Sequence, residues 1–375
     1  MKRATSLYLD AVRLGAAVTV LLTHLAYTRF SGGLLTALRS YGNDLVMVFF
    51  VLSGYVIVHT AATRDLDLAT FARNRAVRLY SVAVPAIVLT LVLDRWGQAL
   101  QPALYHGTWY QSSAPLLRVV RAATFTNELW FSSVRLFSNG PYWSLGYEAW
   151  YYALFAAAWY LRGWRRLGAV AALALISGPK ILLLLPVWLL GVWVWQHNRT
   201  STLGSGAGAL LWLGSLVLYA GFRAFGLRDA LLAWSHWQWG DQVIEQQLRW
   251  SNEFLSSYVI GLLVACNFVG FHACAARAAG ALECCAPLLR HWAGYTFSIY
   301  LFHYPLLQFL ASLRLVDAHS PLAAPVLLVL TVLGCCALGT VTEQRKAGLH
   351  ALLFGAAQGQ PRMAVRAAPP GSPPP

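Results

Sequence analysis

Ten apolar segments, separated by short polar stretches, recur along the chain and set its predicted architecture. Each is read as a membrane helix, because about 20 apolar residues are needed to cross a bilayer; the segment at 166–178 is short for that task. The predicted helices cover 8–28, 43–61, 79–96, 143–161, 166–178, 180–196, 204–222, 254–272, 292–313 and 322–342. The pattern predicts an all-α polytopic membrane protein with about ten transmembrane helices.

The first of these segments carries two ionisable residues, Arg13 and His24. Eleven helical steps of ~100° return a side chain to within roughly 20° of its starting direction, so the two lie on one face. They are separated by about 16 Å along the helix axis. An unpaired charge facing lipid costs at least ~2.5 kcal/mol, so this face is predicted to meet protein or a water-filled cavity. These two residues also favour a retained helix over a cleaved signal peptide.

Composition agrees with a membrane protein, since 58% of the 375 residues are hydrophobic and only 11% are charged. The net charge of +14 comes from basic residues scattered through short loops, which indicates membrane topology and no nucleic-acid partner. The six cysteines form no CxxC pair and no metal-ligand spacing with histidine, so we expect no metal.

The distribution of charge predicts the orientation. With the N-terminus in the cytoplasm, most basic loop residues fall inside and most acidic ones fall outside, as the positive-inside rule requires. Both termini are then cytoplasmic. We expect one transmembrane domain over 1–345 and a Pro-, Ala- and Gly-rich, disordered tail over 346–375.

Two predicted outward loops, 97–141 and 223–252, are rich in Trp, Tyr, Gln and Ser. Aromatic rings stack on sugar rings while amides and hydroxyls bond sugar hydroxyls, so these loops suit a carbohydrate. An interfacial aromatic belt explains the same composition equally well.

Polar residues in later segments also need an explanation. Ser53-Gly54 permits close helix packing. Arg75 and Arg78 share a helical face near Arg73, and this cluster fits either a phosphorylated cofactor or anionic lipid. Each of Arg13, Glu148 and His303 is explained either by a structural contact, such as Asp10 for Arg13, or by function.

Five motifs, in order, resemble the bacterial acyltransferase-3 family of integral membrane acyltransferases. They are LDAVR with His24 eleven residues after Arg13, FFVLSGYVI, FARNRAVRLY, PYWSLGYE and SIYLFHYP, at 9–13, 49–57, 71–80, 141–148 and 298–305. Two departures stand out: Ala11 replaces the usual Gly, and Asp44 lies further from the Phe pair than the acidic residue of the family.

The resemblance implies transfer of an acyl group, commonly acetyl, from cytoplasmic acyl-CoA to a hydroxyl of a glycan or a glycosylated small molecule. It also implies a multi-pass protein of the bacterial inner (plasma) membrane, in contact with its lipids, whose acceptor is a carbohydrate or lipid-linked glycan. The residues that match the motifs of the family are Arg13, His24, Arg73, Arg75, Arg78, Trp143, Ser144, Glu148, Tyr300 and His303.

The leading hypothesis assigns a role to each group of residues. Arg73, Arg75 and Arg78 bind CoA phosphates, His24 acts as general base, Arg13 stabilises the oxyanion and Glu148 orients His24. Ser53, Trp143, Ser144, Tyr300 and His303 are expected to be substrate or structural polar residues. The rival hypothesis is a polytopic carrier or glycan-lipid translocase, in which Arg13, Glu148 and His303 bind substrate or relay protons without bond formation.

Overall fold

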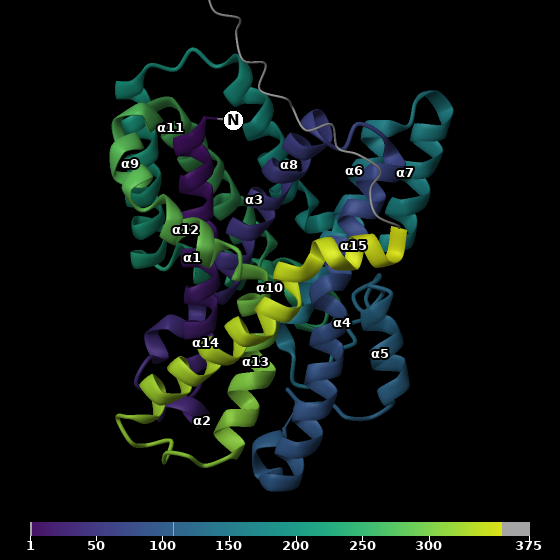
Figure 1. The fold of residues 1–375 in the computed structure, drawn as a ribbon, viewed down its shortest axis with the longest axis vertical. Coiled ribbons are helices and arrows are strands. Elements are labelled where there is room, and N and C mark those ends of the chain that lie inside the picture. Colours follow the sequence, from purple (N-terminus) through teal and green to yellow (C-terminus); the bar gives the residue numbers. More distant parts are fainter. Residues whose placement is uncertain (1, 108, 355–375) are drawn as a thin grey trace, which may run out of the picture.

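A computed structural model describes residues 2–107 and 109–354, and every predicted segment contains a helix (Figure 1). These helices are α1 (Arg3–Leu25), α3 (Gly42–Thr63), α4 (Leu68–Leu100), α6 (Trp143–Tyr160), α7 (Gly163–Ser177), α8 (Pro179–Thr200), α9 (Ser205–Ala224), α11 (Phe254–Cys284), α13 (Thr296–Ser312) and α14 (Ala323–Val341). Seven helical segments among the described residues are long and apolar enough to cross a membrane. The prediction of an all-α polytopic membrane protein is confirmed.

Shorter elements join these helices. They are α2 (Thr28–Ser31), α5 (Pro115–Ala123), α10 (Leu227–Trp239), α12 (Ala286–Ala293) and α15 (Lys346–Phe354), with 3₁₀ turns at Thr36–Tyr41, Pro102–Tyr105, Gly140–Tyr142, Arg249–Ser251 and Glu343–Arg345 and a π-helix at Gln242–Leu248. The predicted tail therefore begins as a helix at 346–354. Residues 355–375, where a disordered tail was expected, lie outside the described residues.

Helix α4 is much longer than the predicted segment 79–96 and includes the basic stretch before it. Asp67 caps its N-terminus, with its carboxylate accepting hydrogen bonds from the Thr70 amide at 2.9 Å and the Thr70 hydroxyl at 2.6 Å. These bonds lower the pKa of Asp67. Because the helix starts here, Arg75 and Arg78 are fixed on a rigid element.

The first predicted outward loop is partly helical and partly buried. Ser138 and Asn139 are fully buried between helices, and the Asp94 carboxylate accepts bonds from the Ser138 amide at 2.8 Å and its hydroxyl at 2.6 Å. The segment 97–141 is therefore not solvent-exposed throughout, while its outward orientation stays a prediction. Its polar composition is explained by internal hydrogen bonds, which hydrophobic periodicity cannot register.

Helices α3 and α8 cross in close contact through two glycines. A Cβ atom at Gly54 would collide with the Trp188 carbonyl oxygen, and one at Gly191 would collide with the Val51 carbonyl oxygen. The obstructing atoms belong to backbone and cannot move aside without separating the helices. The predicted packing role of Gly54 is confirmed, and α3 is placed firmly beside the site.

Candidate functional site

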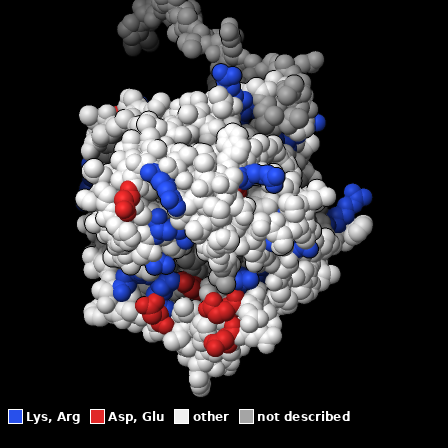
Figure 2. Space-filling model, turned by 90° about the horizontal axis from the view of Figure 1, so that it is seen from below, with Lys and Arg blue, Asp and Glu red and all other residues white. Residues whose placement is uncertain are grey.

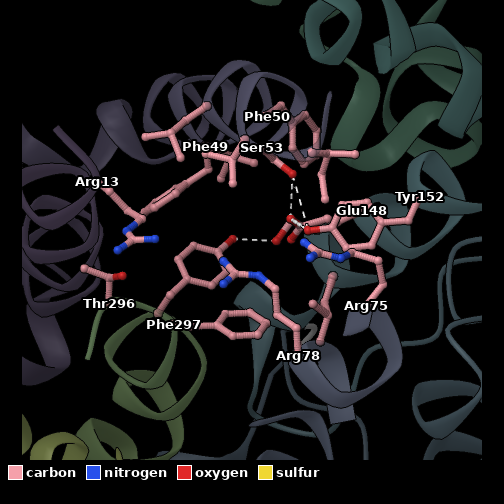
Figure 3. A pocket seen from close by; sticks show the side chains of 17 residues that line it. Arg13, Phe49, Phe50, Ser53, Arg75, Arg78, Glu148, Tyr152, Thr296 and Phe297 are labelled. Atoms are coloured by element: carbon pink, nitrogen blue, oxygen red, sulfur yellow. Dashed lines mark hydrogen bonds between the residues drawn. The ribbon is translucent and has the colours of Figure 1, made fainter. Parts of the chain in front are cut away.

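A cavity of about 70 Å³ lies at the meeting point of α1, α3, α4, α6 and α13 (Figure 3). Its polar lining combines residues from all five helices: Arg13, Ser53, Arg75, Arg78, Ser144, Glu148, Tyr152, Thr296 and Tyr300. Phenylalanine and aliphatic side chains complete the wall. We call this space the basic cavity, because three arginines and one carboxylate line it.

Hydrogen bonds hold the Glu148 carboxylate in the basic cavity. The Ser53 hydroxyl donates to Glu148 Oε1 at 2.7 Å, and the Tyr152 hydroxyl donates to the same oxygen. Trp188 Nε1 donates in turn to Ser53 Oγ at 3.2 Å, so a fully buried indole fixes the serine. Helices α3, α6 and α8 together determine where this negative charge lies.

The arginines of the basic cavity retain unused hydrogen-bond donors. Arg13 donates to Asp10 at 3.1 Å and to the Ala293 carbonyl at 3.0 Å, and Arg75 forms an ion pair with Asp65 at 3.1 Å. The buried Nε atoms of Arg13 and Arg75 have no partner among the described residues. The predicted contact between Arg13 and Asp10 exists, yet Arg13 also faces the cavity, so its structural and functional interpretations are compatible.

Arg73 does not reach the basic cavity, although Arg75 and Arg78 do. Its side chain is exposed, and its guanidinium lies 5.7 Å from the Phe354 ring centroid on α15. The family motif includes Arg73, but only Arg75 and Arg78 of these three line the basic cavity. The reason is helical geometry, since Arg75 and Arg78 are three apart whereas Arg73 lies about 140° away from Arg78 around the helix.

A second cavity, of about 410 Å³, contains His24, and we call it the His24 cavity. Trp143, Trp250, Asn43 and Asn252 contribute rings and amides to its lining. Its remaining lining residues include Tyr27, four arginines and two glutamates. This cavity is much larger than the basic cavity, and it combines arginines with tryptophan rings, amides and a histidine.

Two side chains, Val46 and Tyr300, line both cavities. The Tyr300 ring lies edge-on to Phe49 in the basic cavity at 5.3 Å and is 6.4 Å from the His303 ring. Its hydroxyl is 2.7 Å from Ser144 Oγ. Tyr300 is thus part of a thin wall between the arginine cluster and the histidines.

His24 and His303 form a hydrogen-bonded pair on α1 and α13. His303 Nδ1 is 2.8 Å from the Ile299 carbonyl, which can only accept, so neutral His303 carries its proton on Nδ1. Its Nε2 then accepts from His24 Nδ1, 3.1 Å away; the Val20 carbonyl lies 2.9 Å from the same Nδ1. These contacts assign the proton of His24 to Nδ1, and among the described residues its Nε2 has no hydrogen-bond partner, so the lone pair of Nε2 can accept a proton.

The histidine pair corrects one part of the sequence-based hypothesis. Glu148 does not orient His24, because its carboxylate is bound by Ser53 and Tyr152 while His24 is oriented by His303. Arg13 and His24 do share a helix, as the spacing predicted, but they line different cavities.

The structure adds residues that the sequence did not single out. Tyr152 is one helical turn after Glu148, a spacing that could have indicated their contact. Trp250 stacks on Trp143 with ring centroids 5.3 Å apart and planes at 2°. Trp250 lies in a single 3₁₀ turn and Arg135 in an irregular segment, and both are too short to give a periodic signal.

The chain is similar in sequence to known acyltransferases. The profile of a family described as "Acyltransferase domain" matches residues 6–340. Acyltransferase MdmB of Streptomyces mycarofaciens is 28% identical over 159 residues, which are 40% of this chain and 38% of the relative. An O-acetyl transferase of Shigella phage Sf6 is 36% identical over 90 residues, 23% of this chain and 26% of the relative.

Each of these two alignments spans well under half of the relative. No solved structure is significantly similar to this chain.

Proposed function

Because this chain belongs to the acyltransferase family, we propose that it is a membrane O-acyltransferase that uses acyl-CoA and acylates a carbohydrate hydroxyl. The acyl group proposed is acetyl. The single observation that carries the proposal is the pair of cavities, one basic and one with a histidine base, separated by Val46 and Tyr300.

The basic cavity suits the donor. The phosphates of acyl-CoA are anionic, and Arg75 and Arg78 line the cavity on one rigid helix with Arg13 opposite them (Figure 3). Arg13 and Arg75 each have a buried Nε without a hydrogen-bond partner among the described residues. Such a donor favours the binding of a ligand that accepts hydrogen bonds, as a phosphate does.

The His24 cavity suits the acceptor. Trp143 and Trp250 offer aromatic faces to a sugar ring, while Asn43 and Asn252 offer amides to its hydroxyls. The aromatic residues of the loops fit a sugar site and an interfacial belt equally well. For Trp250 we favour the sugar site, because this residue lines a cavity.

The chemistry follows from the tautomer of His24. Its Nε2 takes the proton of the acceptor hydroxyl as the hydroxyl oxygen attacks the thioester carbonyl carbon, so a new C–O bond forms. The C–S bond then breaks, and the CoA thiolate leaves with the proton returned from His24. Arg13 lines the basic cavity, and we assign it to the thioester oxygen as the stabilising cation.

The proposed location is the bacterial inner membrane, with the basic cavity reached from the cytoplasm. In that orientation α1 begins inside with Lys2 and Arg3 and brings His24 toward the outer half of the membrane. Donor and acceptor would then approach from opposite sides.

The proposal is tested by following label from radioactive acetyl-CoA in membranes that contain the protein. Arg75→Gln with Arg78→Gln should raise the KM for acetyl-CoA by about tenfold or more, since each removes a charged hydrogen bond worth ~1.5–3 kcal/mol. Arg73→Gln is the matched control and should leave that KM within about twofold, because Arg73 lies outside the cavity.

Label in a glycan ester supports the enzyme. Movement of glycan across the membrane without any label in an ester would instead support the carrier hypothesis. An equal rise of KM in the Arg73 control would contradict the assignment of the donor to the basic cavity.

A further inference from the structure

The His24 cavity contains more positive charge than a neutral sugar requires. Four of its lining residues are arginines, Arg39, Arg135, Arg228 and Arg249, against the two glutamates Glu245 and Glu253. Figure 2 shows basic and acidic side chains gathered around a hollow at the end of the molecule where α1 finishes. Most of the remaining surface in this view is uncharged.

An internal ion pair with Arg228 accounts for one of the two glutamates, Glu253. Arg228 donates to the two oxygens of Glu253, with Nε to Oε2 at 2.8 Å, and Asn43 also donates to Glu253 at 3.3 Å. Glu245 lies 3.2 Å from His236 Nε2. Glu253 and Arg228 are therefore already paired, and among the described residues Glu245 contacts a histidine and none of the arginines, which leaves the other three arginines to consider.

Aromatic rings and backbone, not carboxylates, hold two of these three arginines. The Arg39 guanidinium lies 4.8 Å from the Tyr27 ring centroid, and that of Arg135 lies 5.8 Å from both Trp109 and Tyr304. Arg135 also donates to the Ser138 carbonyl at 3.3 Å. Ring contacts orient a guanidinium without neutralising it.

Among the described residues, none of Arg39, Arg135 and Arg249 forms an ion pair with a carboxylate. The buried Nε of Arg135 has no hydrogen-bond partner there either. A buried guanidinium N–H without an acceptor is costly, and a bound anion would remove that cost.

The backbone around Arg249 is strained. Arg249 has a φ of 52° and follows the π-helix at Gln242–Leu248. A left-handed conformation at a residue other than glycine costs about 1–3 kcal/mol, and π-helical turns occur often at functional sites. Arg249 lines the cavity, and among the described residues its side chain forms no hydrogen bond or ion pair.

We infer that the acceptor is anionic: a carbohydrate that carries a carboxylate or phosphate, bound by Arg39, Arg135 and Arg249 while its hydroxyl meets His24. This inference rests on the proposed function and specifies the substrate class of the acceptor cavity. A carboxylate in a sugar unit and a phosphate that links the glycan to lipid present the same chemistry to a guanidinium, because both accept paired N–H donors.

The test uses purified protein in lipid nanodiscs, labelled acetyl-CoA and matched acceptors. One pair compares an oligosaccharide of glucuronic acid with its carboxyl-reduced glucose counterpart; the other compares a prenyl-phosphate-linked saccharide with the corresponding prenyl glycoside. We expect kcat/KM to be about tenfold or more higher for the charged member of one pair. The pair that shows the difference identifies carboxylate or phosphate as the anion.

The double variant Arg39→Gln, Arg249→Gln should bring that ratio close to one. Both side chains are exposed, so their replacement spares the core. Arg314→Gln is the matched control, because Arg314 lies after α13 and lines a different cavity; it should leave the ratio as it is. Equal kcat/KM values for charged and neutral acceptors in the wild-type protein would overturn the inference while leaving acyl transfer established.

Binding without donor separates this inference from the proposed function. If no acceptor is acetylated, the proposed function fails, and the affinities of fluorescent acidic and neutral oligosaccharides decide the inference. Tighter binding of the acidic one, lost in the double variant and kept in Arg314→Gln, supports an anion site. Equal or undetectable binding of both overturns it.

Discussion

His303 offers the sharpest test of the proposed chemistry, because it touches His24 and lines neither of the two cavities described above. It is fully buried, and its Nε2 accepts a hydrogen bond from His24 Nδ1 at 3.1 Å. We therefore treat His303 as a positioning residue. His303→Leu removes the acceptor, whereas His303→Gln keeps a carbonyl oxygen close to the position of Nε2.

The magnitude follows from the change in charge during the reaction. When His24 takes the proton of the acceptor hydroxyl, its bond to His303 becomes charge-assisted, and such a bond contributes ~1.5–3 kcal/mol. Its loss corresponds to a fall in kcat of roughly ten- to 150-fold. The Val20 carbonyl, 2.9 Å from the same Nδ1, remains as a second acceptor. We therefore expect His303→Leu to lower kcat by about tenfold, with His303→Gln less affected.

The assay is acetyl transfer from labelled acetyl-CoA, with kcat and the KM values of donor and acceptor determined separately. A positioning role lowers kcat and leaves the KM for acetyl-CoA within about twofold, because His303 does not line the donor cavity. His24→Ala should lower kcat by about 10²- to 10⁴-fold, as expected for loss of a general base.

The double variant His24→Ala, His303→Leu should be no slower than His24→Ala alone, since His303 acts only through His24. Independent, multiplicative losses in the double variant would refute the pairing. An unchanged kcat in a correctly inserted His303→Leu variant would refute it as well. A larger loss for His303→Leu than for His24→Ala would reverse the roles of the two histidines.

Two further predictions concern stability and can be measured by thermal unfolding in detergent. Glu128 and Lys180 form a buried ion pair with 2.7 Å between the Glu128 carboxylate and Lys180 Nζ. Lys180→Met should destabilise the protein by about 3–5 kcal/mol, because it leaves the Glu128 carboxylate buried without its partner. Adding Glu128→Gln should recover part of the lost stability, and no recovery would contradict the ion-pair argument. Gly191→Ala should lower the free energy of unfolding by about 1–3 kcal/mol or more, because the added Cβ forces α3 and α8 apart. The control is Gly214→Ala on α9, where nothing lies within 4 Å of the added Cβ. That variant should leave the melting temperature unchanged or raise it.

Much of the fold followed from local pattern, for a physical reason. A helix that crosses lipid must satisfy its own backbone and present apolar side chains over its length, so each segment records its structure in its own residues. The ten segments were found in this way. The same reasoning identified Arg13, Glu148 and His303 as residues that required an explanation, because polar groups inside apolar helices are costly.

The membership of each cavity could not be read from the chain, because it depends on which helices cross and at what depth. Spacing placed Arg75 and Arg78 on one helical face, and the family resemblance added Arg73, but only Arg75 and Arg78 line the basic cavity. Chemistry alone suggested Glu148 as the partner of His24. Packing instead places Ser53 and Tyr152 around Glu148 and His303 beside His24.

Irregular segments were the least predictable, since their side chains follow no period. Nothing local indicates that Ser138 and Asn139 are buried or that Arg135 and Trp250 line the His24 cavity. The sequence by itself determined a membrane-embedded helical protein with ionisable residues in its spans, because lipid constrains each helix separately. Only the tertiary structure decided that the histidine pair and the arginine cluster lie on either side of Tyr300. Their positions depend on how helices that are far apart in the sequence pack against one another.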